Sequence, residues 1–368
     1  MKYYIISGEA SGDLHGSNLI KELSFLDEKA EYRVWGGDLM QEQGAEVVKH
    51  YRDLAFMGFI EVVQNLGTIM KNISFCKSDI LSYNPDVVIF IDYPGFNLKI
   101  AEFAKKAGFK VFYYISPSLW AWNKSRIKII RKYIDRMFVI LPFEKPFYKE
   151  LNYEVDFVGH PLLDSLTKLK GDFKEFCSEN GLSEKKIIAI LPGSRKQELK
   201  RMLPVMLSLC EYYSEYQFVI GGAPGLEADL YASYFKENKL PVIFEQTQRL
   251  LANATAAVVT SGTATLEAAL FKVPEVVCYK GGAISYIIAK MLAKVDYISL
   301  PNLIMEKEIV KELIQKTMTL KNVKKELDNI LYNKSYYSGM ISNFDLLEEK
   351  LGGKGASKKT AEKIIAYL

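Results

Sequence analysis

Short, continuous apolar runs alternate with charged, amphipathic segments along most of the chain. Before residue 160 the apolar runs are rich in β-branched and aromatic residues, which is typical of parallel strands buried on both faces. The charged segments between them are long enough to form crossover helices. In this first half we expect strands at 3–7, 32–35, 86–91, 110–115, 136–141 and 155–158.

The same alternation restarts after a polar stretch at 164–186 that contains no strand pattern. Strands are expected here at 186–191, 217–220, 241–245, 256–260 and 275–279. A chain of 368 residues exceeds the size at which a single core stops growing. We therefore predict an α/β protein with two doubly wound domains that face each other across a cleft. The expected bounds are 1–165 for the first domain, 166–185 for a linker region, 186–340 for the second domain and 341–368 for a helical tail.

Composition narrows the class of protein. The formal net charge of +4 is far below that of a dedicated nucleic-acid binder. The four cysteines are scattered without a C-x-x-C pair, which argues against a zinc site or a disulfide framework and fits a reducing compartment. The uncharged stretches are too short and too polar to span a bilayer, and no signal-peptide pattern opens the chain. A cytoplasmic protein is expected.

The second domain contains the clearest ligand pattern. Its first strand ends in LPGSR, which places Arg195 just beyond the carboxyl edge of a sheet, where open α/β sheets bind ligands. Its fourth strand runs into small residues at 260–265, which leave room for an anion at the N-terminus of the next helix. Glu267, in the first turns of that helix, could accept both hydroxyls of a ribose. A simple helix cap would explain the second feature alone, but together with Arg195 it favours a nucleotide diphosphate site.

The first strand ends in a glycine turn that carries carboxylates, SGEASGD at 7–13. Glycines suit a tight turn close to a ligand, but Glu9 and Asp13 would repel a phosphate. A carboxylate here suits removal of a proton from a hydroxyl group. Asp92, at the end of another buried strand, could serve the same purpose or form an Asx turn before Pro94. Glu9 and Asp92 are equal candidates for a general base.

Two further patterns concern substrates and surfaces. The loop SPSLWAWN at 116–123 carries two tryptophans, and the basic segment 124–136 follows it. The tryptophans either form a platform for a sugar or pack in the core. Residues 59–73 have apolar side chains at helical spacing, and Lys71 and Lys77 lie close by. This helix either packs into the core or docks on an anionic membrane surface. The side chains proposed for membrane contact are Phe59, Val63, Leu66 and Met70.

Motifs spread over nearly the whole chain resemble those of the lipid-A-disaccharide synthase family. They are SGEASGD (7–13), MGFIEV (57–62), IDYPGFN (91–97), SPSLWAWN (116–123), LPFEKPFY (141–148), VGHPL (158–162), LPGSR (191–195), TSGTATLEAA (260–269) and SLPNLI (299–304). The resemblance implies a GT-B fold of two Rossmann-like domains. It places the acceptor mostly on the first, membrane-facing domain and the UDP-sugar mostly on the second.

The resemblance also implies a reaction. The 6-hydroxyl of 2,3-diacylglucosamine 1-phosphate would attack the anomeric carbon of UDP-2,3-diacylglucosamine, invert that centre and expel UDP. The family needs no metal or other cofactor, and no D-x-D motif occurs in this sequence. Its members are peripheral proteins of the cytoplasmic face of the inner membrane, so acylated sugar substrates and an anionic membrane surface are the expected partners, with no nucleic acid.

Site residues follow from the resemblance position by position. The residues implied in UDP binding are Arg195, Ser261, Gly262, Thr263, Glu267 and Asn302. The residues implied in acceptor binding are Ser11, Asp13, Trp120, Trp122, Arg126 and Arg131. Many family members carry a second acidic residue at the position of Gly95, so this chain must take its base from Asp92 or Glu9 if the family uses that residue.

Other classes of protein fit less of the sequence. A UDP-N-acetylglucosamine 2-epimerase or a MurG-like transferase would share the two domains and the TSGT loop, but would not explain SGEASGD and SPSLWAWN together. A non-catalytic sugar-nucleotide-binding protein would have no need of the carboxylates at 9, 13 and 92. A NAD-linked dehydrogenase is disfavoured because no G-x-G-x-x-G follows any strand.

Overall fold

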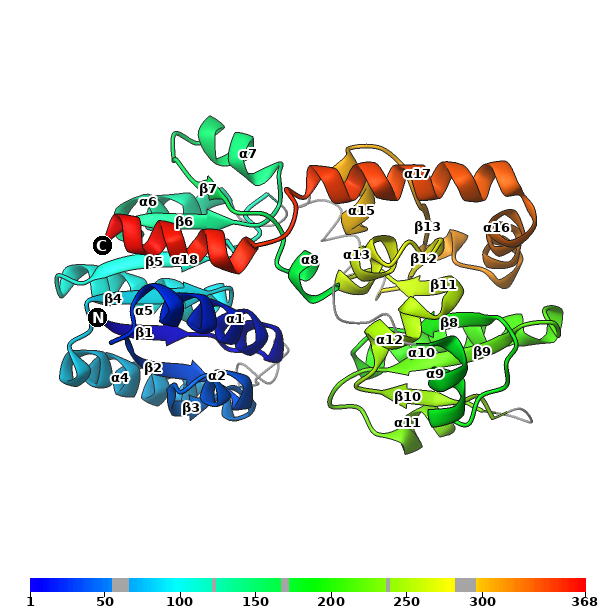
Figure 1. Cartoon of the computed structure of the whole chain (residues 1–368), viewed down its shortest axis with the longest axis horizontal. Helices are drawn as coiled ribbons and strands as arrows, with labels where there is room; N and C mark the ends of the chain where they lie inside the picture. Colours follow the sequence, from blue (N-terminus) through cyan, green and yellow to red (C-terminus); the bar gives the residue numbers. More distant parts are fainter. Residues whose placement is uncertain (55–65, 121–123, 167–171, 236–238, 282–295) are drawn as a thin grey trace. The chain divides into compact units, whose positions relative to one another are not determined.

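The chain forms two α/β units, each built around a parallel sheet (Figure 1). The structure is a computed structural model that describes all residues except 55–65, 121–123, 167–171, 236–238 and 282–295. Unit 1 comprises Met1–Pro161 and Leu351–Leu368, and unit 2 comprises Leu162–Lys350. The two doubly wound domains expected from the sequence are therefore present.

Unit 1 contains a seven-stranded sheet in the order β3-β2-β1-β4-β5-β6-β7. All neighbouring strands are parallel. The order reverses direction between β1 and β4, the position at which open α/β sheets bind ligands. The strands are β1 (Lys2–Ile6), β2 (Glu31–Gly36), β3 (Glu46–His50), β4 (Val87–Ile91), β5 (Lys110–Tyr114), β6 (Arg136–Val139) and β7 (Asp156–Phe157).

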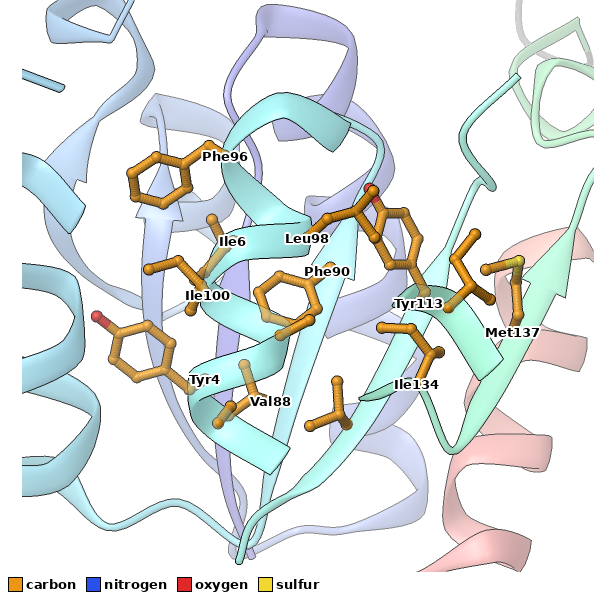
Figure 2. Packing of buried hydrophobic residues seen from close by; sticks show 14 of the residues in the cluster. Tyr4, Ile6, Val88, Phe90, Phe96, Leu98, Ile100, Tyr113, Ile134 and Met137 are labelled. Atoms are coloured by element: carbon orange, nitrogen blue, oxygen red, sulfur yellow. The ribbon is translucent and has the colours of Figure 1, made fainter. Parts of the chain in front are cut away.

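Helices cover both faces of this sheet because successive strand residues point to opposite sides. On β1, Tyr3 and Ile5 pack with residues of α1, α2 and α18, whereas Tyr4 and Ile6 pack with residues of α4, α5 and α6. Figure 2 shows the second of these layers, in which Phe96 and Ile100 of α5 lie over β1 and β4. The helices of unit 1 are α1 (Ala10–Leu26), α2 (Asp38–Glu42), α4 (Leu66–Tyr83), α5 (Pro94–Lys106), α6 (Ile127–Tyr133), α7 (Glu144–Glu150) and α18 (Ala356–Tyr367).

Unit 2 contains a six-stranded parallel sheet in the order β10-β9-β8-β11-β12-β13. Its strands are β8 (Ile187–Leu191), β9 (Gln217–Gly222), β10 (Val242–Phe244), β11 (Ala254–Thr260), β12 (Glu275–Tyr279) and β13 (Lys311–Ile314). Its helices are α8 (Leu162–Ser165), α9 (Phe173–Glu179), α10 (Lys196–Leu207), α11 (Ala228–Ala232), α12 (Thr247–Ala252), α13 (Thr263–Leu270), α15 (Leu300–Met305), α16 (Leu320–Tyr332) and α17 (Lys334–Lys350). The central strand β8 is fully buried, as its apolar run predicts.

Short 3-10 helices occupy four connections within the described residues. They are η1 (Tyr51–Asp53), η2 (Lys124–Arg126), η4 (Ser208–Tyr212) and η5 (Gln315–Thr317).

The division of the chain differs from the expected bounds at the C-terminal end. Residues 341–350 complete α17 within unit 2, whereas α18 returns to unit 1 and packs against α1 (Figure 1). Ala361 and Ile364 of α18 are buried in the core of unit 1, so the expectation of a separate tail at 341–368 is wrong. The described part of the expected linker, including α9, belongs to unit 2, where Phe176 is fully buried.

Candidate active site

In unit 1, the candidate base Asp92 lies in a strained turn at the carboxyl end of β4. Asp92 and Tyr93 have φ values of 45° and 48°, and Ile115 at the end of the neighbouring β5 has a φ of 63°. This left-handed region is unfavourable for most side chains, although Asp and Asn tolerate it better than others, and such residues cluster at functional sites. Buried groups hold the turn in place: the Asp92 carbonyl accepts hydrogen bonds from Asn97 Nδ2 at 2.6 Å and from the Tyr113 hydroxyl at 2.5 Å.

Glu9 lies close enough to Asp92 for their charges to interact. Glu9 is exposed and immediately precedes α1. Asp92 is exposed at the surface, but loss of solvation by its carboxyl, together with the charge of Glu9, raises the pKa of Asp92 to about 6. The structure thus brings the two candidate bases together at the switch point of the sheet. A carboxylate with a pKa near 6 is suited to accept a proton at neutral pH.

Asp13, the other carboxylate of the glycine turn, has a structural role. It is 2% exposed, and its Oδ1 accepts hydrogen bonds from the backbone N–H groups of Gly37 at 2.7 Å and Met40 at 3.2 Å. Its Oδ2 accepts one from Leu39 N–H at 3.1 Å. Asp13 therefore satisfies the free N–H groups at the start of α2. This geometry does not support the expectation that Asp13 binds the acceptor. Ser11 is exposed on the first turn of α1, and its role in acceptor binding stays a prediction.

The loop after β5 brings one of the two predicted tryptophans to the same edge of the sheet. Trp120 is half-buried and packs edge-on against Phe143, with ring centroids 5.1 Å apart. Trp122 lies outside the described residues. Arg126 is half-buried just before α6, and Arg131 is exposed in the last turn of that helix. Acceptor binding by these residues stays a prediction.

In unit 2, Arg195 lies directly before α10, in the loop after β8. Its side chain is 73% exposed and contacts Glu198, with Nη1 and Oε1 3.5 Å apart. Glu198 Oε2 accepts hydrogen bonds from the backbone N–H groups of Ser194 at 3.0 Å and Arg195 at 3.2 Å. Glu198 thus fixes the loop and leaves most of the Arg195 guanidinium free for a ligand.

The N-terminus of α13 is open on the same unit. Gly262 precedes the helix and no side chain caps it, while Gly262 and Thr263 are exposed. Ser261 is held in place, since its hydroxyl donates to the Ile298 carbonyl at 2.9 Å and its N–H donates to the Cys278 carbonyl at 3.0 Å. Free N–H groups at a helix N-terminus are a typical site for a phosphate.

Glu267 lies one turn into α13. Burial raises the pKa of its carboxyl above the ordinary value, and Gln248 Nε2 of α12 donates to its Oε1 at 3.4 Å. This long hydrogen bond leaves lone pairs of the carboxyl available to a sugar hydroxyl. Ribose binding by Glu267 stays a prediction.

Asn302 does not lie free in the predicted donor site. Its side chain is fully buried, and its Oδ1 accepts from the N–H groups of Ile309 at 2.7 Å and Val310 at 3.0 Å. Its Nδ2 donates to the Val310 carbonyl at 2.9 Å and to Glu312 Oε1 at 2.9 Å. All the hydrogen-bonding capacity of the amide is used within unit 2. The structure therefore gives Asn302 a structural role, and the expected contact with UDP has no support from this geometry.

The predicted membrane-contact residues fall partly on α4. Phe59 and Val63 lie outside the described residues, and of Leu66 only its place at the start of α4 is described. Met70 is 59% exposed, whereas Ile73 is 5% exposed and packs in the core, so the expected apolar face does not include Ile73. Phe75 and Leu81 of the same helix are exposed as well.

The residues described by the structure contain neither a metal-binding cluster nor a helix that could span a membrane. There, no three His, Cys, Asp or Glu side chains are grouped so that they could hold a metal ion. Within the same ranges, none of the helices has the length and apolar character needed to cross a bilayer.

The chain matches the family described as lipid-A-disaccharide synthetase over residues 3–365. It belongs to this family. A lipid-A-disaccharide synthase from Trichlorobacter lovleyi is 35% identical over 99% of this chain and 97% of the relative. The enzyme of the same name from Syntrophus aciditrophicus is 39% identical over 97% of this chain and 95% of the relative.

Solved structures of other proteins show that this family member has the GT-B fold. A UDP-GlcNAc 2-epimerase from Neisseria meningitidis aligns with a TM-score of 0.68 at 15% identity, covering 100% of this chain and 99% of the other. The UDP-GlcNAc 2-epimerase of Methanocaldococcus jannaschii gives 0.67 at 16% identity, with both chains fully covered. At these identities the likeness concerns the fold and not the activity.

Several residues that shape the candidate site were given no role by the sequence. Asn97 and Tyr113 fix the Asp92 turn, and Glu144 binds the loop that carries Trp120. Asn97 lies in the motif IDYPGFN and Glu144 in the motif LPFEKPFY, and these motifs were the sequence features that could have indicated a role. Their partners are backbone groups or side chains distant in sequence, so the motifs alone did not reveal their contacts.

Proposed function

We propose that this synthase-family member joins two acylated glucosamines. The 6-hydroxyl of 2,3-diacylglucosamine 1-phosphate attacks the anomeric carbon of UDP-2,3-diacylglucosamine. A bond forms between O6 and C1, the bond from C1 to the UDP oxygen breaks, and the configuration at C1 inverts. The hydroxyl proton passes to a carboxylate of unit 1. The family match over residues 3–365 carries this proposal, and the paired Glu9 and Asp92 supply the chemistry it needs.

We propose that unit 2 binds the UDP group. The exposed guanidinium of Arg195 and the open N-terminus of α13 at Gly262 and Thr263 would bind the diphosphate. Both stabilise negative charge that develops on the leaving group. Ser261 would hold the loop, and Glu267 would accept hydrogen bonds from the ribose. Support comes from two proteins of the same fold, which were solved with UDP-GlcNAc, in one case together with UDP.

Asp92 is the better candidate for the base. Its raised pKa, its place at the switch point and the buried groups that hold its strained backbone are features of a residue kept in one position for a reaction. Glu9 would then act through its charge, which helps to raise the pKa of Asp92. Exchange of the two roles is the alternative, and the pH dependence of turnover distinguishes them.

We propose that the reaction proceeds without a metal or other cofactor. The positive charge required at the leaving diphosphate would come from Arg195 and from the N–H groups at the start of α13. The acceptor phosphate would meet Arg126 and Arg131, which follow the Trp120 loop. This assignment rests on the family resemblance and on the available basic groups.

We further propose that the protein docks on the cytoplasmic face of the inner membrane through α4. Met70 and Leu81 of this helix are 59% and 53% exposed, and Lys71 adds an exposed positive charge. Exposed apolar side chains beside lysines suit an anionic lipid surface. Substrates with long acyl chains would reach the enzyme from such a surface.

The test of the proposed function is whether release of UDP depends on the acceptor. With UDP-2,3-diacylglucosamine alone, the enzyme should release little UDP, and adding 2,3-diacylglucosamine 1-phosphate should start the reaction. Interconversion of UDP-N-acetylglucosamine with its 2-epimer, without any effect of the acceptor, would instead identify an epimerase. Tight UDP-sugar binding with no turnover would identify a non-catalytic binding protein.

A further inference from the structure

A buried carboxylate, distant in sequence, fastens the loop that carries Trp120. Glu144, the first residue of α7, is 2% exposed. Its Oε1 accepts a hydrogen bond from the Ser116 hydroxyl at 2.5 Å, and its Oε2 accepts one from the Leu141 N–H at 3.0 Å. The loop after β5 is thereby tied to the start of α7 through one side chain.

A second contact from α7 holds the next residue of the same loop. The hydroxyl of Tyr148 donates to the carbonyl of Pro117 at 3.3 Å. Trp120, three residues on, packs against Phe143, which directly precedes Glu144. Glu144 and its neighbours therefore attach the loop on both sides of Pro117 and contact Trp120 through Phe143.

Among the residues that the structure describes, no basic side chain stabilises the charge of Glu144. The groups that face it are the Ser116 hydroxyl, the N–H groups of residues 140 and 141, the Trp120 indole and the Tyr148 phenol. Burial outweighs the hydrogen bonds and raises the pKa of Glu144 to about 7, while burial keeps the Tyr148 phenol uncharged by raising its pKa above the ordinary range. A carboxyl in this setting changes its charge near neutral pH.

We propose that Glu144 is a positioning residue for the acceptor sugar, and that gain or loss of its proton shifts the 116–120 loop and with it Trp120. This inference rests on the proposed function, because it assumes that unit 1 binds the acceptor. A glutamine of the same shape could satisfy both Leu141 and Ser116 without placing a charge in the core. Unlike a glutamine, the glutamate at this position can take up or release a proton.

Glu144→Gln separates this role from a purely structural one. Its amide oxygen can accept from Leu141 N–H while its NH2 group donates to the Ser116 hydroxyl, so the variant imitates the protonated state. Ser116→Ala removes a hydrogen bond that favours the ionised state and should move the titration of Glu144 to higher pH. Glu150→Gln, at the exposed end of the same helix, is the matched control.

The first measurement is tryptophan fluorescence of a Trp122→Phe background, titrated between about pH 5 and pH 9, a range that spans the ionisation of Glu144. A transition with a midpoint near pH 7 is expected, unchanged by Glu150→Gln, displaced upward by Ser116→Ala and lost in Glu144→Gln. Persistence of the same transition in Glu144→Gln would overturn the coupling between Glu144 and Trp120. No substrate is needed, so this outcome is independent of the proposed function.

The second measurement is KM for the acceptor as a function of pH. In the wild type we expect it to change about fivefold between pH 6 and pH 8, the size that rearranging one hydrogen bond produces. In Glu144→Gln it should stay at the low-pH value throughout, with KM for the donor unchanged in both proteins. If the acceptor KM of the wild type does not change with pH although the fluorescence transition is present, Glu144 does not position the acceptor.

Discussion

The ring of Tyr93 lies directly over the backbone of Gly8. A Cβ atom at Gly8 would be 2.4 Å from Tyr93 Cγ, closer than two non-bonded carbon atoms can approach. This contact joins the glycine turn after β1 to the strained turn after β4, and so joins the loops of Glu9 and Asp92. The glycine of the opening motif thus allows the loops that carry Glu9 and Asp92 to pack closely.

We therefore expect Gly8→Ala to displace the Tyr93 ring and the Asp92 turn with it. Overpacking of this kind costs about 1–3 kcal/mol of unfolding free energy, and turnover should fall further than stability alone explains. Gly95→Ala is the control, since nothing lies within 4 Å of a Cβ at that position. Urea unfolding and initial rates measure both effects. Equal behaviour of the two alanine variants would show that the contact with Tyr93 has no consequence.

The pH dependence of turnover tests the base. Because Asp92 must be ionised to accept a proton and its pKa is raised to about 6, kcat/KM should fall as the pH drops through 6. Asp92→Asn should lose roughly 100-fold or more in turnover. It should also abolish the acid limb of the pH profile, which is the fall of kcat/KM at low pH. The variant should fold, because asparagine tolerates the left-handed backbone at this position.

Glu9→Gln is the companion variant for the same measurement. Removing the neighbouring negative charge should lower the pKa of Asp92 and move the acid limb to lower pH. If Glu9→Gln instead abolishes the limb and Asp92→Asn retains both the limb and the turnover, the roles are reversed and Glu9 is the base.

Arg195 and Glu267 are expected to contribute separately to UDP binding. Loss of one charge-assisted contact in Arg195→Ala or Glu267→Ala should weaken binding by about 1.5–3 kcal/mol. Lys186→Ala removes an exposed positive charge just before β8, at the opposite edge of the sheet, and should leave the affinity unchanged. Isothermal titration of UDP into folded protein decides the matter. Wild-type affinity for UDP in both site variants would show that the donor site does not lie in this part of unit 2.

Membrane docking through α4 can be separated from packing of the core. Met70→Ser combined with Leu81→Ser should reduce binding to vesicles containing anionic lipid, with little loss of stability, because both side chains are exposed. Ile73→Ser is the contrasting variant: its side chain is buried, so it should lower the melting temperature. Vesicle flotation and thermal unfolding distinguish the effects. Undiminished flotation of the Met70 and Leu81 double variant would place the docking surface elsewhere.

The buried strands could be predicted from sequence because each is a continuous apolar run. Two of the four edge strands, β7 and β10, were also expected, but β3 (EVVKH) and β13 (KELI) were not, because charged residues interrupt their apolar positions. The return of α18 to unit 1 also left no local signal, since its lysine-rich helix is held by burial of Ala361 and Ile364 against distant residues.

Within the candidate site, residue type and strand position predicted Glu9, Asp92 and Arg195 at the carboxyl edges where the structure places them. Asp13 and Asn302 were less predictable, because a side chain that binds backbone N–H groups looks the same in sequence as one that faces a ligand. Their partners, at 37–40 and 309–310, are set by loop geometry that no periodic pattern records.

The most direct test of the account is the structure of the product formed from both substrates. With donor labelled with carbon-13 at the anomeric position, NMR should show a disaccharide in which labelled C1 is bonded to O6 of the acceptor, with inverted configuration and one UDP released per bond formed. Asp92→Asn should form the same product far more slowly. Labelled free sugar, labelled epimer, or a linkage that retains the donor's configuration would contradict the proposed transfer.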